Sequence, residues 1–136
     1  MHPKSILIVD DELLIRDLLY DFFTERNWQV SVADSAEKGL ELLKIRRFQI
    51  VVVDLKMPEV DGIDFLKKVK TISPAIPTIL MTGFPSLESA VEALRLKVDD
   101  YVIKPFNINR LYKTIDSIVE ENARESAPIN IEDVAL

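Results

Sequence analysis

The sequence contains no cysteine, and its single histidine is His2, beside the N-terminus. Without cysteine the chain can form neither a disulfide framework nor a thiolate metal site. One terminal histidine also excludes a histidine-based catalytic triad and a histidine zinc cluster. The chemistry of this protein must therefore come from other side chains, above all from carboxylates, hydroxyls and lysines.

The sequence also lacks an apolar run of transmembrane length, and its N-terminus shows no signal-peptide pattern. We therefore expect a cytoplasmic protein that makes no membrane contact. A formal net charge of −6 argues against direct nucleic-acid binding by this domain. The 136 residues have the length of one domain, which we assign to residues 1–123. Residues 124–136 lose the helical periodicity and are predicted to be a tail or linker.

Two stretches of the sequence combine a continuous apolar run with an acidic end. Residues 50–53 are apolar and β-branched and are followed by Asp54, and the run at 5–9 is followed by Asp10 and Asp11. An apolar run without polar alternation predicts a strand covered on both faces, as in the middle of a parallel sheet. If the two strands are neighbours, three carboxylates converge at one edge of the sheet.

Carboxylates that converge in this way repel one another, and a folded protein usually keeps them for a hard cation with oxygen ligands. We therefore predict a Mg²⁺ site. The alternative is that Asp10 or Asp11 caps the helix that follows, which would be the better interpretation of one acid after one strand. The acids at two strand ends favour the metal site.

Apolar periodicity predicts three further strands and five helices. The further strands are residues 28–33, 78–81 and 100–104, and the first and last of them alternate apolar and polar residues. The five helices are expected to begin near residues 12, 35, 61, 86 and 107. The first helix is expected to pack on the sheet through a broad apolar stripe, formed by Leu14, Leu18, Leu19, Phe22 and Phe23. The fourth has apolar residues at helical spacing, namely Leu87, Ala90, Val91 and Leu94.

Five strands alternating with five helices predict an α/β fold with a doubly wound parallel sheet of the flavodoxin-like type. Alternating strands suit the edges of such a sheet, and continuous apolar strands suit its interior. The strand order 2-1-3-4-5 meets both conditions. It places the switch point, where ligands bind in open α/β sheets, between the first and third strands. The predicted carboxylates lie at that point, and Thr82 and Lys104 end the fourth and fifth strands at the same edge.

The groups at this edge suit phosphoryl transfer. A divalent cation, a lysine and a hydroxyl can stabilise the charge of a transferring phosphoryl group, and a carboxylate can accept that group as an acyl phosphate. The sequence carries, in order, Asp10-Asp11, Asp54, Met57-Pro58, Asp61-Gly62, Thr82-Gly83 and Lys104-Pro105-Phe106. Over about residues 4–122, this ordered set resembles the receiver domain of bacterial two-component response regulators, the chemotaxis regulators among them.

The resemblance implies that Asp54 is the phosphoacceptor and takes its phosphoryl group from the phosphohistidine of a sensor kinase or phosphotransfer protein. It implies Mg²⁺ bound by Asp11, Asp54 and the backbone carbonyl of Met57, with Asp10 acting through water. Lys104 is expected to contact the phosphoryl oxygens. Such a domain is a signalling phosphoacceptor and not an enzyme, apart from its own phosphorylation and dephosphorylation.

The resemblance also implies a cis bond between Lys104 and Pro105, and a switch pair formed by Thr82 and Tyr101. The hydroxyl of Thr82 would move to a phosphoryl oxygen, and the ring of Tyr101 would turn into the vacated space. The face made by the last two helices and the fifth strand is then expected to bind a partner or to form a homodimer. One departure from the family pattern is Lys97-Val98, where relatives often have Gly-Ala before the strand.

Two other functions use related features. A Mg²⁺-dependent phosphohydrolase resembling the haloacid dehalogenases would carry Asp-x-Asp after its first strand, but Asp54 is followed by Leu55 and Lys56. A receiver-like scaffold that is never phosphorylated would be expected to lack part of the acidic set, and this chain retains all of it.

Overall fold

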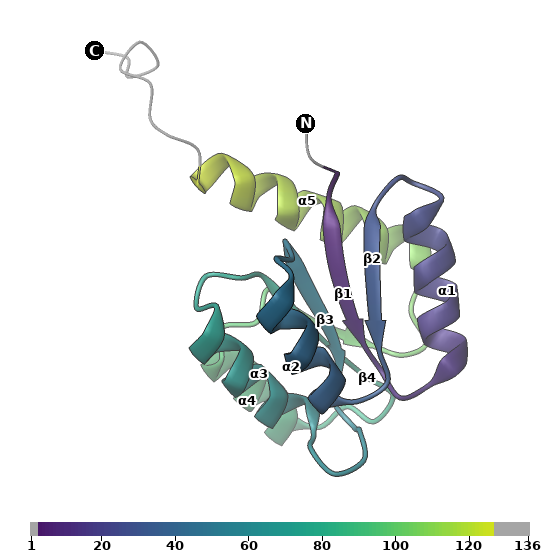
Figure 1. Cartoon of the computed structure of the whole chain (residues 1–136). Helices are drawn as coiled ribbons and strands as arrows, with labels where there is room; N and C mark the ends of the chain where they lie inside the picture. Colours follow the sequence, from purple (N-terminus) through teal and green to yellow (C-terminus); the bar gives the residue numbers. More distant parts are fainter. Residues whose placement is uncertain (1–2, 127–136) are drawn as a thin grey trace.

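The computed structural model describes residues 3–126 of the chain. Strands and helices alternate throughout this range (Figure 1). They are β1 (Ser5–Val9), α1 (Leu13–Thr24), β2 (Gln29–Ala33), α2 (Ala36–Ile45), β3 (Ile50–Asp54), α3 (Gly62–Ile72), β4 (Thr78–Thr82), α4 (Leu87–Arg95), β5 (Asp100–Ile103) and α5 (Ile108–Ser126). The last helix continues past residue 123 to Ser126, and the rest of the predicted tail, residues 127–136, lies outside the described residues.

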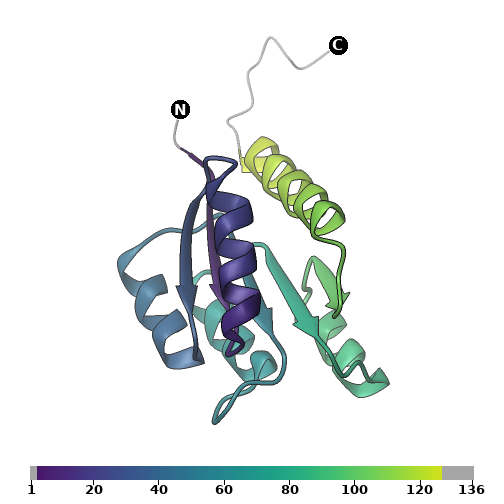
Figure 2. The ribbon, with the colours of Figure 1, turned by 90° about the vertical axis from the view of Figure 1, so that its right-hand side faces the viewer.

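The five strands form one parallel sheet in the order β2-β1-β3-β4-β5. This order confirms the predicted doubly wound α/β fold. The helices form two layers, one on each side of the sheet (Figure 2). α1 and α5 contribute to one apolar core, and α2, α3 and α4 contribute to the other.

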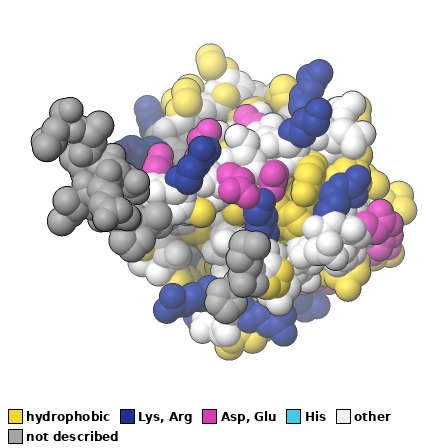
Figure 3. Space-filling model, turned by 90° about the horizontal axis from the view of Figure 1, so that it is seen from above, with side chains coloured by type: hydrophobic (Ala, Val, Ile, Leu, Met, Phe, Trp, Pro, Cys, Tyr) yellow, Lys and Arg dark blue, Asp and Glu magenta, His cyan; other side chains and the backbone are white. Residues whose placement is uncertain are grey.

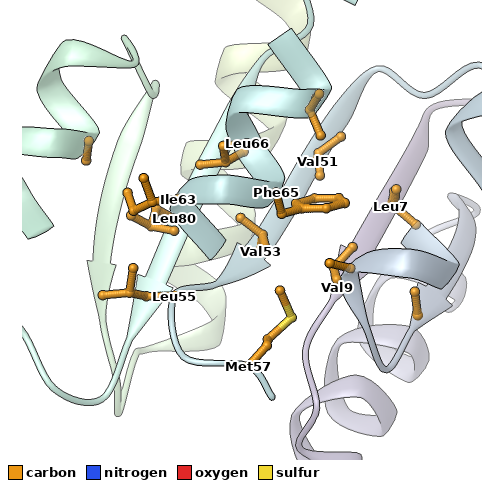
Figure 4. Packing of buried hydrophobic residues seen from close by; sticks show 14 of the residues in the cluster. Leu7, Val9, Val51, Val53, Leu55, Met57, Ile63, Phe65, Leu66 and Leu80 are labelled. Atoms are coloured by element: carbon orange, nitrogen blue, oxygen red, sulfur yellow. The ribbon is translucent and has the colours of Figure 1, made fainter. Parts of the chain in front are cut away.

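The three inner strands supply both cores because successive side chains of a strand point to opposite faces. Leu7, Val9, Val51 and Val53 pack toward α2 and α3, as Figure 4 shows around the ring of Phe65. The alternate residues, such as Ile8 and Val52, pack toward α1 and α5. All residues of β3 and β4 are buried, whereas the edge strands β2 and β5 are largely half-buried or exposed. The prediction that the two strands with alternating apolar and polar residues lie at the edges of the sheet is therefore confirmed.

The predicted helix starts near residues 35, 61 and 86 are confirmed, and each is capped by a side chain. Ser35, Asp61 and Ser86 each accept the backbone N–H three residues later, which satisfies one of the free donors at a helix start. The end of α4 is less regular. Lys97 has a φ of 56°, in the left-handed region that favours glycine. The lysine at the departure from the family pattern therefore takes a glycine-like backbone conformation.

Two predicted apolar stripes are only partly buried. On α1, Leu19 and Phe23 are buried, but Leu14 is 81% and Leu18 46% exposed. The expectation that the whole α1 stripe packs on the sheet is therefore wrong for these two leucines. On α4 the outcome is similar, because Leu87 and Leu94 are exposed and the buried positions are Ser89 and Ala93.

The N-terminal ends of the strands are tied to α5 by aromatic and charged contacts. Nε1 of Trp28 donates to the hydroxyl of Tyr112 at 3.2 Å, and Nζ of Lys4 contacts Asp116 at 2.6 Å and Glu120 at 2.5 Å. Lys4 also lies over the Trp28 ring, 5.8 Å from its centroid. Figure 3, seen from above, shows acidic and basic side chains next to one another on this end of the molecule. None of the helices within residues 3–126 combines the length and the apolar composition that a membrane-spanning helix needs.

Candidate functional site

Asp54 is the last residue of β3, and only 4% of it is exposed. The chain leaves the strand in a loop that returns closely to its own start, where the N–H of Gly62 donates to the carbonyl of Leu55 at 2.7 Å. A Cβ atom on Gly62 would lie 2.5 Å from the carbonyl oxygen of Asp54. Glycine at this position therefore allows α3 to begin directly against the end of β3.

Asp10 follows β1 and is fully buried. Its Oδ1 accepts the backbone N–H of Glu12 at 2.9 Å, so this carboxylate shapes the turn into α1. The residue at the helix N-cap position is Glu12, and its side chain makes no capping bond. Asp11 is exposed, and within residues 3–126 its side chain makes no hydrogen bond that would cap α1, the alternative role considered for it.

Lys104 reaches this edge from the end of β5, and its bond to Pro105 is cis, as the family resemblance implies. The ammonium group donates to Oδ2 of Asp10 at 2.8 Å and to Oε1 of Glu12 at 2.9 Å. It also lies 3.4 Å from Oδ1 of Asp54. The side chain of Lys104 is 10% exposed, so these contacts form in a largely buried setting.

Burial and mutual repulsion set the charge state of the site. Burial, together with the charge of Asp10, raises the pKa of Asp54 from 3.8 to about 6. Burial also raises the pKa of Asp10, and the hydrogen bond from Lys104 offsets part of this effect. For Lys104, burial acts to lower the pKa, but hydrogen bonds to Asp10 and Glu12 outweigh it and raise the pKa overall. The structure thus holds two buried acids that an added positive charge would stabilise.

Ligand oxygens of Asp10, Glu12 and Asp54 lie within 4.8 Å of one another. A hard cation such as Mg²⁺ takes oxygen ligands of this kind, so the two buried acids of this group, Asp10 and Asp54, fit the predicted metal. The carboxylate of Asp11 is not in this group, and Met57 is largely buried in the loop after Asp54. Sequence reasoning missed Glu12. The available signal was its position between the acidic pair at the end of the strand and the first residue of the helix.

The predicted switch residues lie on the α4 side of the same edge. Thr82 ends β4 and is fully buried, and its hydroxyl accepts the backbone N–H of Phe84 at 3.0 Å. Tyr101, in β5, is half-buried, and its hydroxyl is 2.6 Å from that of Ser89 in α4. Thr82 is thus held within its own turn, and Tyr101 is bonded to α4.

Comparisons with known proteins agree with this geometry. A family model described as the response regulator receiver domain matches residues 6–116. The chain belongs to this family. Receiver domains act in two-component signalling, where they generally bind Mg²⁺ at an acidic site and interact with sensor kinases.

Curated relatives of the receiver domain are regulators of transcription. The chain is 39% identical to the transcriptional regulatory protein ZraR of Escherichia coli O157:H7 over 112 residues, covering 82% of this chain and 25% of ZraR. It is 41% identical to the regulatory protein AtoC of Escherichia coli K12, covering 79% of this chain and 23% of AtoC. The chain therefore spans about a quarter of the length of these relatives.

Solved structures of receiver domains have the same architecture. A CheY-like receiver domain protein from Methanospirillum hungatei JF-1 has a TM-score of 0.89 and 31% identity, covering 92% of this chain and 100% of that one. The receiver domain of the Francisella response regulator 1452 has a TM-score of 0.80 and 28% identity, covering 87% and 98%. The fold of this receiver domain is therefore shared along almost its full described length.

Proposed function

We propose that Asp54 is the phosphoacceptor of this receiver domain and that a sensor histidine kinase or phosphotransfer protein is the donor. The observation that supports this assignment is the position of Asp54, a nearly buried carboxylate at the carboxyl edge of a parallel sheet, 3.4 Å from the ammonium group of Lys104. Ligands of open α/β sheets bind at this edge. The side chain is thus presented to a ligand at one end and enclosed by the core at the other.

In the proposed reaction, a carboxylate oxygen of Asp54 attacks the phosphorus of a phosphohistidine. An O–P bond forms and the P–N bond breaks, and the electron pair of the P–N bond goes to the imidazole nitrogen, which takes up a proton from solvent so that a neutral histidine leaves. The product on this chain is an acyl phosphate. Asp54 must be ionised to attack, so the pKa of about 6 leaves it mostly reactive at neutral pH.

The side chains of this domain position and stabilise the reacting group. Lys104 provides a positive charge for the phosphoryl oxygens, because its Nζ already lies beside Oδ1 of Asp54. Asp10 holds that ammonium group in place through the bond of 2.8 Å. Burial of both acids excludes water from their inner sides and strengthens these charge interactions.

Mg²⁺ would be held by Asp11, Asp54 and the carbonyl of Met57, with Asp10 acting through water. When bound, the ion supplies positive charge that offsets the repulsion between the acids and the phosphoryl group. The support for a metal here is the cluster of carboxylate oxygens beside Asp54 and the raised pKa of that residue.

The output of the domain is proposed to run through Thr82 and Tyr101. The hydroxyl of Thr82 would move from the N–H of Phe84 to a phosphoryl oxygen, and Tyr101 would then leave Ser89 and turn inward. The face of α4, β5 and α5 would change and bind a partner or a second copy of the chain. Exposed apolar residues on this face, such as Leu94 and Ile103, support that role. The domain would work in the cytoplasm and would not itself act on an outside substrate.

The assignment is tested by treating the protein with acetyl phosphate and Mg²⁺ and measuring its intact mass. We expect the parent and the control variant Asp64→Asn, which changes an exposed acid on α3, to gain one phosphoryl group. Asp54→Asn should gain none, and chelation of Mg²⁺ should prevent the gain in the parent. Modification of Asp54→Asn at the parental rate would show that another residue is the acceptor. An unmodified parent would favour the scaffold function.

A further inference from the structure

Lys104 is held between two carboxylates of different character. Its Nζ donates to Asp10 at 2.8 Å and to Glu12 at 2.9 Å, and it lies farther, at 3.4 Å, from Asp54. The side chain of Asp10 is completely buried, whereas that of Glu12 is 56% exposed. Asp10 is therefore a fixed partner of the ammonium group, while the carboxylate of Glu12 can leave it for water.

The hydrogen bonds of the two acids reinforce this difference. Oδ2 of Asp10 accepts a hydrogen bond from Lys104, and Oδ1 accepts one from the backbone N–H of Glu12. Two hydrogen bonds therefore hold the carboxylate of Asp10 in place. Within residues 3–126, the only hydrogen bond of the Glu12 side chain is the one to Lys104. Rotation of Glu12 into solvent would therefore break one exposed ion pair and would leave the turn into α1 intact.

The ammonium group that Glu12 binds is also the group that the phosphoryl oxygens need. An ammonium has three donors, and in this arrangement Asp10 and Glu12 each take one at short distance. A phosphoryl group on Asp54 would bring negative charge to the same place, where the negative charge of Glu12 would repel it. Glu12 thus opposes phosphorylation in two ways, by holding Lys104 and by its own charge.

From these contacts, and resting on the proposed function above, we propose that Glu12 is a positioning residue that competes with the phosphoryl group for Lys104. Its effect is to slow the phosphorylation of Asp54. An ion pair with one exposed partner is weak, so the expected acceleration on its removal is about two- to fivefold. This role differs from that of a metal ligand, for which removal of Glu12 would slow the reaction.

The experiment measures the rate of phosphorylation by phosphoramidate and Mg²⁺, followed by intact mass. Glu12→Gln removes the charge and keeps the shape, and we expect it to react about two to five times faster than the parent. Glu12→Asp keeps the charge but is one methylene shorter, so it should also react faster if the contact with Lys104 matters. Asp17→Asn, which removes an exposed charge from α1, is the matched control and should react at the parental rate.

A second arm repeats Glu12→Gln in a Lys104→Met background. If Glu12 acts mainly through Lys104, the acceleration is clearly smaller there, and what is left of it measures the repulsion by the charge of Glu12 itself. An equal acceleration with and without Lys104, or a rate of Glu12→Gln that is unchanged or slower, would overturn the proposal.

Binding of Mg²⁺ provides a readout that does not depend on phosphorylation. We expect the affinity of Glu12→Gln, obtained from the rise of the melting temperature with Mg²⁺, to stay within about twofold of the parent. A loss of tenfold or more would make Glu12 a metal ligand and would contradict its proposed role. If the parent itself is not modified, the proposed function fails and this inference fails with it. If all variants are modified at equal rates, only the inference fails.

Discussion

α3 and α4 cover the same face of the sheet, but they are held in very different ways. α3 buries five residues along its length, including the large side chains of Phe65 and Leu66. α4 buries only Ser89 and Ala93, and it leaves Leu87 and Leu94 exposed. α3 begins at the loop that follows Asp54, whereas α4 begins close to Thr82 and is bonded to Tyr101.

This difference separates two tasks within one layer of helices. The helix next to the proposed acceptor carboxylate is fixed by apolar burial, which is strong and does not depend on the state of the site. The helix next to the proposed switch is joined by fewer buried groups and by hydroxyl contacts, which are individually weak. Regions with little apolar burial open and move at lower cost. The contrast predicts that α4 shifts on phosphorylation while α3 stays in place.

The largest effect is expected from Gly62→Ala, which breaks the attachment of α3. The added methyl group would lie 2.5 Å from the carbonyl oxygen of Asp54 and 2.8 Å from the Cα of Leu55, both backbone atoms that cannot rotate away. We expect a loss of about 2–3 kcal/mol in the free energy of unfolding, measured by urea denaturation. The control is Gly83→Ala on the α4 side, where the nearest atom would be 3.9 Å away and the loss should be small. Equal losses in the free energy of unfolding for the two variants would contradict the proposed difference between the attachment of α3 and that of α4.

The second effect is the pH dependence of stability that arises from the carboxylate of Asp54, next to α3. The pKa of Asp54 is about 6 in the folded protein against an ordinary 3.8, so the folded state binds this proton more tightly than the unfolded chain does. The resulting stabilisation is fully present below about pH 4 and is lost as the pH rises through about 6. Without metal, Asp54→Asn should therefore gain on the order of 1 kcal/mol over the parent between pH 4 and pH 8.

Urea denaturation across this pH range measures the gain. Asp64→Asn is the matched control, since it makes the same change in charge at an exposed acid of α3, outside the group of acids around Asp54, and should follow the pH dependence of the parent. Ser89→Ala on the α4 side should follow it as well, because a serine hydroxyl does not titrate in this range. If the free energy of unfolding of Asp54→Asn depends on pH in the same way as that of the parent, Asp54 is not the source of this dependence.

The smallest effect is expected from the hydroxyl contact that joins α4 to β5. Ser89→Ala and Tyr101→Phe each remove one partner of the 2.6 Å contact, so the double variant should lose less stability than the sum of the single variants. We expect a coupling of about 1 kcal/mol in urea denaturation. Additive losses would mean that this contact does not hold α4, and the helix would then need another attachment.

The sequence was sufficient for the sheet and for part of the site. Continuous and alternating apolar runs gave the correct strand order, because a strand in the middle of the sheet is buried on both faces and an edge strand is not. Helix starts were predicted correctly near residues 35, 61 and 86, where Ser35, Asp61 and Ser86 cap the helices in the structure. The meeting of Asp10, Asp54 and Lys104 followed from the fold, since parallel strands end at one edge.

The failures share one physical reason. Helical spacing shows that Leu14 and Leu18 lie close together on α1, but it does not show whether a partner surface covers them. In the same way, the order of acids after β1 does not show which carboxylate turns toward Lys104. The bond from Glu12 N–H to Asp10 sets that turn, and it brings Glu12 to the site while Asp11 faces solvent. The roles proposed for Thr82, Tyr101 and Met57 remain predictions.

The contacts of Trp28 make this receiver domain convenient for optical measurements. The only tryptophan of the chain is 5% exposed, packs edge-on against Phe23 and donates to the hydroxyl of Tyr112. It lies at the N-terminal end of the strands, whereas Asp54 lies at their carboxyl end. Its emission should therefore report the docking of α5 and global unfolding, and it should respond little to events at the carboxylates. Undocking of α5, followed by the emission of Trp28, and phosphorylation at the carboxylates, followed by intact mass, can thus be measured separately in one sample.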